Sequence, residues 1–358
     1  MRRQTQLNKG QRGFVLVLTL WVMVIVAIAA AYFAETVSDA VELAQKSRQN
    51  TQATIDMAGT RAEILYRLAT TSLTVDGLGR GNTLIALDNR PYRAVGDTLV
   101  RVQDTRGLLN LNQTTDDRLL RFLGLMGIPA EQRSHLIDTL RDYVDADKLE
   151  RLNGAEEPQY LARQLPPPTN NALATPWEAR RIIGWRDSPQ LWQNSRFIDL
   201  TTTSTVLGLN PNTAPVEVLA TLPGVTEELA QTLVNRRTQF PILHTGQLAE
   251  FAGIPEQLLD MQIMVVPGDT LRVTQSAHGA NWGLQYSVSL TPNGKRGPWR
   301  IDYFSRVGNP VATASSAGAQ SLSPETRDTP ASRAALIPAL PPRSTAVPDI
   351  SPAIRFGG

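Results

Sequence analysis

The first 34 residues combine a basic segment with the longest apolar run in the chain. Residues 1–13 carry four cations and no acid, and an uncharged stretch of 21 residues follows from Phe14 to Ala34. As an α-helix this stretch reaches ~32 Å, which is enough to cross a bilayer. Because the cations precede it, the positive-inside rule places the N-terminus in the cytoplasm and the rest of the chain across the membrane. The pattern predicts a leader at residues 1–13 and a transmembrane helix at residues 14–34.

The helix is predicted to continue beyond the apolar run. No proline occurs between Glu35 and Leu73, and apolar residues recur at helical spacing among charged ones. The apolar positions are Val37, Val41, Ala44, Ile55, Ala58, Ala62, Leu65 and Leu68. This period predicts one helix of about fifty residues, apolar in its first half and amphipathic in its second.

Segments with the two-residue period of β-strands form two groups that lie far apart in the chain. A short hairpin is predicted at 91–105, and three strands are predicted at 270–275, 282–291 and 298–307. The long stretch between the two groups has helical patterns instead. We therefore predict an α+β fold, in which a long N-terminal helix and an antiparallel sheet are interrupted by a large inserted α-helical domain. Its segments are 35–106 (helix extension and first strands), 107–266 (insert) and 267–308 (last strands).

The insert contains an internal repeat. Asn110-Leu111-Asn112 and a turn at Gly127 are echoed a hundred residues later by Asn210-Pro211-Asn212 and a turn at Gly224, and a partial third copy spans 248–255. The second copy resembles a helix-hairpin-helix motif, with Gly224 supplying the positive-φ turn. Such motifs often bind the DNA backbone, so a membrane-anchored DNA-binding protein of the competence type is the alternative function.

Two acids argue against DNA binding by the second copy. Glu227 and Glu228 follow its turn directly, where a phosphate would need free amides and lysines. We therefore favour a structural use of the hairpin as a packing unit, and expect no nucleic acid among the partners.

Composition narrows the chemistry that the chain can perform. The formal net charge is +2, and subtracting the four cations of residues 1–13 leaves −2. A chain this close to neutral lacks the excess of positive charge that is typical of nucleic-acid-binding proteins. The absence of cysteine excludes disulfides, thiolate metal sites and a cysteine nucleophile. His135, His244 and His278 are dispersed, and no common hydrolase or phosphate-loop motif occurs. We therefore expect a protein that is not an enzyme.

Residues 309–358, rich in Pro, Ala, Ser and Thr, are predicted to be disordered.

An acid-rich segment at 138–157 is the candidate ion site. It offers Asp142, Asp145 and Asp147, followed by Asn153-Gly154-Ala155-Glu156-Glu157, and these are oxygen ligands that a folded loop could arrange around calcium. The spacing is not that of an EF-hand loop. From composition alone, a solvated acidic loop balanced by nearby cations is the alternative.

The order of these motifs resembles a known family. Gly13 before Phe14 resembles the cleavage site of type IV prepilins and type II secretion pseudopilins, whereas a secretory signal has a shorter apolar run of ~7 to 15 residues with the small-residue site after it. The further order follows that of general secretion pathway protein K: Tyr143-Val144-Asp145-Ala146-Asp147, Asn153-Gly154-Ala155-Glu156-Glu157, Pro168-Thr169-Asn170-Asn171, Trp177-Glu178-Ala179-Arg180 and Asn210-Pro211-Asn212-Thr213-Ala214. On this match, from Gly13 to about Val307, the chain is identified as a member of the K-type minor pseudopilins of type II secretion systems.

Leu18 fits this subtype. Most pilin-like chains have glutamate at the fifth mature position, which here is Leu18, and the resemblance implies that the glutamate pairs with the terminal amine of the subunit nearer the tip. Since an unpaired carboxylate in the membrane costs roughly 2.5 to 3.5 kcal/mol on insertion scales, its loss fits a subunit with no neighbour above it.

The resemblance implies a function, partners and a cofactor. It implies a pilin-like fold, anchored once in the bacterial inner membrane with its bulk in the periplasm. A prepilin peptidase would cut after Gly13 and methylate Phe14. The chain would then join I-type and J-type minor pseudopilins and the major pseudopilin, and would initiate or cap the filament that drives folded proteins through the outer membrane. The resemblance also implies calcium in the insert, held by Asp145, Asp147, Glu156 and Glu157.

Overall fold

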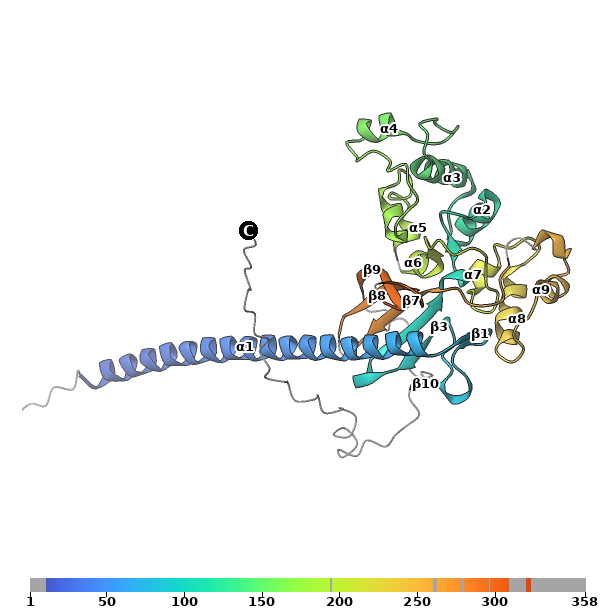
Figure 1. The fold of residues 1–358 in the computed structure, drawn as a ribbon. Coiled ribbons are helices and arrows are strands. Elements are labelled where there is room, and N and C mark those ends of the chain that lie inside the picture. Colours follow the sequence, from blue (N-terminus) through green and yellow to red (C-terminus); the bar gives the residue numbers. More distant parts are fainter. Residues whose placement is uncertain are drawn as a thin grey trace, which may run out of the picture. The chain divides into compact units, whose positions relative to one another are not determined.

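The computed structural model describes residues 11–193, 195–259, 263–277, 280–295, 297–308 and 320–322. Helix α1 (Gln11–Thr70) is one uninterrupted helix of 60 residues, and Figure 1 shows it extending far beyond the elements that pack on its end. At ~1.5 Å per residue it is about 90 Å long. The helix is long and apolar enough to cross a membrane, and its most apolar 18 residues have a mean hydropathy of 2.6 with none of them buried. The predicted long N-terminal helix is confirmed.

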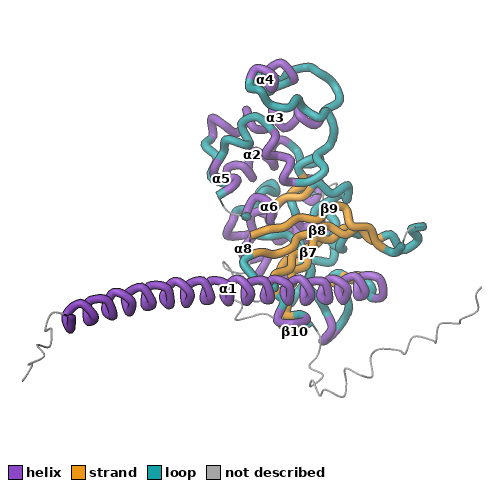
Figure 2. Tube along the Cα trace, turned by 90° about the vertical axis from the view of Figure 1, so that its left-hand side faces the viewer, coloured by secondary structure: helices purple, strands orange, loops and turns teal. Residues whose placement is uncertain are grey.

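A six-stranded sheet packs against the last part of α1 (Figure 2). Its order is β10-β3-β4-β7-β8-β9, and neighbouring strands are antiparallel except β10 and β3. The strands are β3 (Asp88–Arg93), β4 (Leu99–Asp104), β7 (Thr270–Ser276), β8 (Trp282–Leu290), β9 (Trp299–Gly308) and β10 (Gln320–Ser321). Because β4 pairs directly with β7, everything between them in the chain is an insertion between two adjacent strands. The predicted interrupted antiparallel sheet is therefore confirmed.

The connection from α1 to the sheet and the turns around it are short elements. They are β1 (Leu73–Thr74) and β2 (Gly77–Leu78), which pair with each other, and the 3-10 helices η1 (Gly81–Thr83), η2 (Val95–Asp97) and η3 (Thr105–Gly107). The helix η2 connects β3 to β4, and η3 leads from the end of β4 into the insertion.

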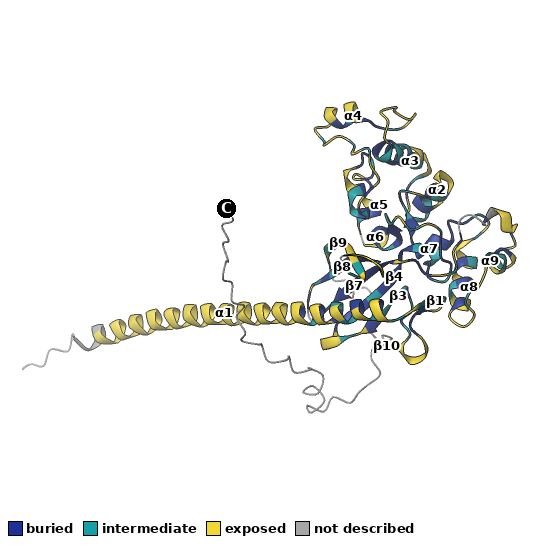
Figure 3. Ribbon diagram, viewed as in Figure 1, coloured by how far each residue is buried: buried dark blue, intermediate teal, exposed yellow. Residues whose placement is uncertain are grey.

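The face of α1 that packs on the sheet differs from the predicted apolar stripe. Leu65 and Leu68 are buried as expected, whereas Ile55 is 59% exposed, and Ala58 and Ala62 are also exposed. The buried positions nearest the sheet are Ala53, Met57, Thr60 and Ile64. The helix has apolar residues on two faces, and the helical period alone does not say which face meets the sheet. Figure 3 shows the other face exposed along the helix from Val15 onward.

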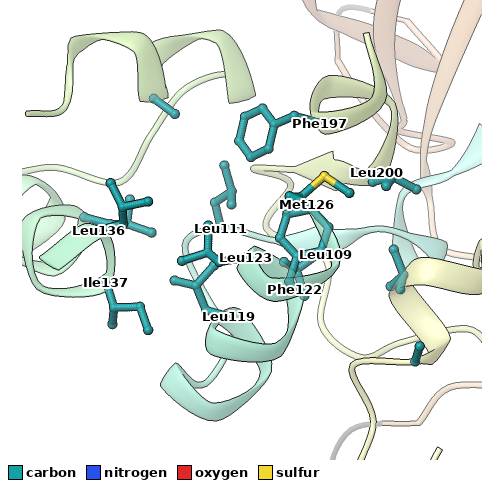
Figure 4. Close-up of a cluster of buried hydrophobic side chains, with 14 of the residues drawn as sticks. Leu109, Leu111, Leu119, Phe122, Leu123, Met126, Leu136, Ile137, Phe197 and Leu200 are labelled. Atoms are coloured by element: carbon teal, nitrogen blue, oxygen red, sulfur yellow. The ribbon is translucent and has the colours of Figure 1, made fainter. Parts of the chain in front are cut away.

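The insert has a core of its own, separate from the core between α1 and the sheet. Its elements are β5 (Leu109–Asn110), α2 (Asp116–Leu125), α3 (Ala130–Val144), α4 (Glu157–Ala162), η4 (Pro176–Arg181), α5 (Pro189–Trp192), α6 (Arg196–Leu200), β6 (Thr201–Thr202), α7 (Val216–Leu219), α8 (Glu227–Arg237), α9 (Thr245–Ala252) and η5 (Glu256–Leu258). Figure 4 shows Leu119, Phe122 and Leu123 of α2 pointing toward Leu136 of α3 and Phe197 of α6. The predicted inserted α-helical part is confirmed.

The two copies of the repeat make the same hydrogen bonds. In the first, the backbone N–H of Asn112 donates to Oδ1 of Asn110 (3.1 Å), and the Asn112 side chain forms a pair of hydrogen bonds with the backbone of Leu173. In the second, the Asn212 N–H donates to Oδ1 of Asn210 (3.0 Å), and its side chain bonds Ile242 N and O. Each asparagine pair therefore ties the start of one hairpin to a distant loop.

The turns of the two hairpins are also alike, since each contains a glycine with a positive φ angle. Gly127 has φ +81° and Gly224 has φ +71°, a left-handed conformation that glycine adopts without strain. In the partial third copy, α9 ends at Gly253 (φ +65°) and is followed by the short 3-10 helix η5.

One part of the segment predicted to be disordered is ordered. Gln320 and Ser321 form β10 beside β3, and Leu322 is 3% exposed in the sheet core with its N–H donating to the carbonyl of Arg93 (2.9 Å). An apolar side chain and the open edge of β3 provide this site, which composition averaged over the whole tail conceals. The remainder of 309–358 lies outside the described residues.

Candidate metal centre

The acid-rich segment forms the end of α3, a loop and the start of α4. Asp145 is the C-cap of α3, and Glu156 is the N-cap of α4. One carboxylate oxygen from each of Asp145, Asp147 and Glu156 lies within 4.8 Å of the other two. Asp147 is exposed, Asp145 is half-buried and Glu156 is buried. The ends of the two helices thus bring three of the four predicted ligands together.

Glu157, the fourth predicted ligand, is directed elsewhere. Its Oε2 lies 3.4 Å from Nζ of Lys148, and its side chain is 50% exposed. The reason is helical geometry: Glu156 is the N-cap and Glu157 is the first residue of α4, so the two side chains leave the helix in different directions.

Asp142, one turn before Asp145 in α3, holds the loop in place. Its side chain is buried, and its Oδ2 accepts hydrogen bonds from the backbone N–H groups of Arg151 (3.2 Å) and Ala155 (2.9 Å). A Cβ atom on Gly154 would lie 1.8 Å from this same oxygen, so a glycine is required there. Asp142 is one of the oxygen ligands that the acid-rich segment offers, but it is not among the four that the resemblance implies; its position three residues before Asp145, on the same helical face, is the signal for its nearby role.

A second set of contacts ties the loop to α3. Oδ2 of Asp138 accepts from the backbone N–H (3.1 Å) and Nδ2 (2.9 Å) of Asn153. Nδ1 of His135 lies 2.6 Å from the carbonyl oxygen of Asn153, and because that oxygen only accepts, Nδ1 must carry the proton. His135 therefore has a structural role at the loop. His244 is the N-cap of α9, and His278 lies outside the described residues.

The centre of the acidic cluster lacks compensating donors. Among the described residues, Oδ1 of Asp142, Oδ1 of Asp145 and Oε1 of Glu156 are buried without a hydrogen-bond partner. Burial raises the pKa of all three carboxyl groups, and repulsion from neighbouring acids raises it further. Arg151 approaches only to 3.8 Å between its Nε and Oδ1 of Asp142. Buried carboxylate oxygens without partners are costly, and a cation between them would remove that cost.

The donor set fits a hard divalent cation. Calcium takes oxygen ligands at ~2.3–2.6 Å, so two ligand oxygens on opposite sides of the ion lie up to ~5 Å apart. The spacing of at most 4.8 Å among the oxygens of Asp145, Asp147 and Glu156 is compatible with one shared ion. The remaining positions of its shell would be filled by backbone carbonyls or water.

The predicted processing site lies in α1. Gly13 and Phe14 both fall within this helix, two and three residues after its first residue, Gln11. The residues that precede Gln11 lie outside the described part of the chain.

The second hairpin has the geometry of a helix-hairpin-helix motif without the charge of a DNA-binding one. Oγ1 of Thr226 caps α8 by accepting from the N–H of Leu229 (3.2 Å). Glu227 and Glu228 then occupy the first turn of α8. Two carboxylates at this helix N-terminus repel a phosphate, which argues against DNA binding by this hairpin.

Comparisons with known proteins find similarity to family models over parts of the chain and to the fold of a solved structure. Residues 87–196 match the family model described as "Type II secretion system (T2SS), protein K", and residues 205–262 match the "Helix-hairpin-helix motif" model. No curated protein matches the chain in sequence. A chain in the crystal structure of the GspK-GspI-GspJ complex from the enterotoxigenic Escherichia coli type 2 secretion system is similar in fold, with a TM-score of 0.53 and 18% identity. The match covers 73% of the present chain and 98% of the other.

Proposed function

We propose that this chain, which belongs to the type II secretion system protein K family, is the minor pseudopilin at the tip of the pseudopilus. There it initiates or caps the filament that drives export of folded proteins through the outer membrane. The observation that carries the proposal is the family match over 87–196 together with a fold shared with a chain of the GspK-GspI-GspJ complex. The role is structural, and we expect no catalysis.

The outer face of α1 supports assembly with other helices. Val37, Val41, Ile55 and Tyr66 are 44%, 50%, 59% and 67% exposed and lie on the side of the helix that faces away from the sheet. A stripe of this kind is suited to pack against apolar helices of neighbouring subunits. We propose that the I-type and J-type minor pseudopilins, and the major pseudopilin below them, supply those helices.

Two features support a place at the tip. Leu18 gives the membrane helix no carboxylate for a subunit above to neutralise. The insert between β4 and β7 adds a second hydrophobic core to the head, and such a wide head is easiest to place where no subunit stacks on top of it. We propose accordingly that the membrane is the inner membrane, with the sheet and insert in the periplasm.

Co-purification tests the proposal. The full chain in detergent is mixed with tagged I-type and J-type minor pseudopilins, and we expect one complex that contains all three. Ile55→Asp should weaken the complex, while Thr54→Asp, about 100° away around the same helix turn, should leave it intact. Failure of the three chains to associate would refute the proposal. Binding of duplex DNA in place of the pseudopilins would favour the competence-type alternative.

We further propose that Asp145, Asp147 and Glu156 bind one calcium ion. The unpartnered oxygens of Asp145 and Glu156 carry this proposal, because a bound cation would supply the missing positive charge. The ion would join the C-terminus of α3 to the N-terminus of α4 and so order the loop between them.

Calorimetric titration of the full chain in detergent tests the calcium proposal. We expect saturable heat and a gain in thermal stability for the natural chain, and the loss of both for Glu156→Gln. Glu157→Gln is the matched control, since Glu157 pairs with Lys148 and should not affect binding. An absence of both heat and stabilisation in the natural chain would refute the site.

Processing after Gly13 is the remaining part of the proposal. Co-expression with a prepilin peptidase should yield a chain that starts at a methylated Phe14, which mass spectrometry detects. Gly13→Val should block the cleavage, and unchanged cleavage of this variant would refute the assigned site.

A further inference from the structure

A pocket of about 360 Å³ lies at the start of the insert, where 105–118 meets the loop 206–209. Its apolar part consists of Leu108, Val206, Leu207 and Leu209. Its polar part includes Arg118, which belongs to α2 and is the only charged side chain among the described residues that line it. The pocket therefore combines an aliphatic wall with one positive charge.

Arg118 is half-buried and has one side-chain partner within the described part of the chain. Its Nε donates to Oγ1 of Thr221 (3.2 Å), and within the described part of the chain the guanidinium has no carboxylate or carbonyl partner. Desolvation and, to a smaller extent, the nearby charge of Arg121 together lower its pKa to about 10, so the group still carries its charge at neutral pH. Its two terminal nitrogens thus have donors to offer.

Two arginines that are buried, unlike Arg118, bond differently. Arg237 donates from Nη1 to the carbonyls of Pro211 (2.7 Å) and Ala214 (2.5 Å). Arg272 donates to three carbonyls at the C-terminal end of α6 and just beyond it. The fold therefore directs terminal nitrogens of these two buried guanidinium groups at backbone carbonyls. Arg118 is different, because its unmatched donors belong to a residue that lines a pocket.

The surroundings of Arg118 also favour an anion. The pocket lies at the N-terminal end of α2, where Thr114 and Thr115 line it and Thr115 is an N-cap whose side chain makes no capping hydrogen bond. Helix N-terminal amides add positive potential. Oγ1 of Thr114, a residue that is 7% exposed, is buried without a partner. The side chains of Thr114 and Thr115 therefore lie near the positive charge without hydrogen-bond partners of their own among the described residues.

We propose that this pocket binds a carboxylate on a short aliphatic stem, held by Arg118 and packed against Leu108, Val206 and Leu209. A planar guanidinium matches a carboxylate in a two-point contact, and the aliphatic wall matches a hydrocarbon stem. A polypeptide presents this chemistry either as a C-terminal aliphatic residue or as a glutamate side chain. The site is independent of calcium and of filament assembly.

Titration of the full chain in detergent with two probes tests the proposal and separates the two sources. N-acetyl-leucine represents a chain end, and N-acetyl-glutamic acid α-methylamide represents a glutamate side chain. N-acetyl-leucine amide, which has no carboxylate, is the matched control ligand. We expect saturable binding of at least one carboxylate probe and none of the amide.

Three variants assign the binding to Arg118. Arg118→Met should weaken binding roughly tenfold or more, the expected effect of losing charged hydrogen bonds. Arg121→Met is the control, because Arg121 donates to the carbonyl of Thr221 (3.0 Å) and does not line the pocket. Gln113→Glu places a competing carboxylate at an exposed lining residue, so it should weaken binding without removing a buried group. The proposal is overturned if neither carboxylate binds, or if Arg118→Met and Gln113→Glu bind as tightly as the natural chain.

Discussion

Asp104 joins the sheet to the insert, and its replacement by alanine should loosen this junction. Its side chain is fully buried at the end of β4 and accepts four hydrogen bonds. Oδ1 accepts from the N–H groups of Arg106 (3.0 Å) and Gly268 (3.1 Å). Oδ2 accepts from Nδ2 of Asn210 (2.9 Å) and Oγ1 of Thr213 (3.0 Å). The carboxylate therefore connects both chain crossings into the insert with its second repeat.

The expected loss of stability follows from these four contacts. Asp104→Ala leaves four donors without their acceptor, and a buried donor without a partner costs ~1–3 kcal/mol. Part of this is offset, since burial raises the pKa of Asp104 and its ionised form is itself disfavoured in the folded state. We expect a net loss of about 2–4 kcal/mol in the free energy of unfolding.

Urea unfolding of the full chain in detergent, followed by tryptophan fluorescence, measures this loss. Trp185 and Trp192 report on the insert, and Trp282 and Trp299 report on the sheet. Asp187→Ala, at an exposed position of the insert, is the control and should change stability by less than about 0.5 kcal/mol. A loss below about 1 kcal/mol for Asp104→Ala would refute the reasoning, because the four hydrogen bonds would then contribute almost nothing.

Three further predictions concern the insert. Gly154→Ala should lower calcium affinity roughly tenfold or more, because its Cβ would displace the carboxylate of Asp142 that holds the loop; unchanged affinity by calorimetry would contradict this. Trp185→Ala should cost about 3–5 kcal/mol in urea unfolding, since the indole is fully buried and donates to a carbonyl of α3, and a cost under 1 kcal/mol would show that the site collapses freely. Asn112→Ala and Asn212→Ala should each cost about 1–3 kcal/mol, and a large cost for only one of them would show that the repeats are not equivalent.

Local sequence patterns were sufficient for the long helix, the main strands and the repeated hairpins, but not for β10. The apolar run from Phe14 to Ala34 predicts the membrane helix, and strict alternation predicts the strands that became β7, β8 and β9. The repeated asparagine pairs at Asn110 and Asn210 predict two related hairpins, and the same hydrogen bonds form in both. These features depend on residues only a few positions apart in the chain, so they can be predicted from a single sequence.

The candidate site was only partly predictable. Asp145, Asp147 and Glu156 come together as expected, because two helix ends set their positions. The different direction of Glu157 depends on where α4 begins, and one residue of error in a helix boundary is enough to reverse the assignment. Asp142 was visible as an acid in the segment, but its role as an acceptor for the loop requires the folded position of Gly154.

The sequence by itself determined a long apolar N-terminal helix, an interrupted sheet, an inserted pair of hairpins and an acidic loop. Only the tertiary structure decided that Met57 and Ile64, and not Ile55, face the sheet, that Leu322 returns to its edge, and that Arg118 lines a pocket with its donors unmatched. The physical reason is that periodicity and turn chemistry act over a few residues, whereas the choice among apolar faces and the partners of a buried charge depend on segments up to hundreds of residues away.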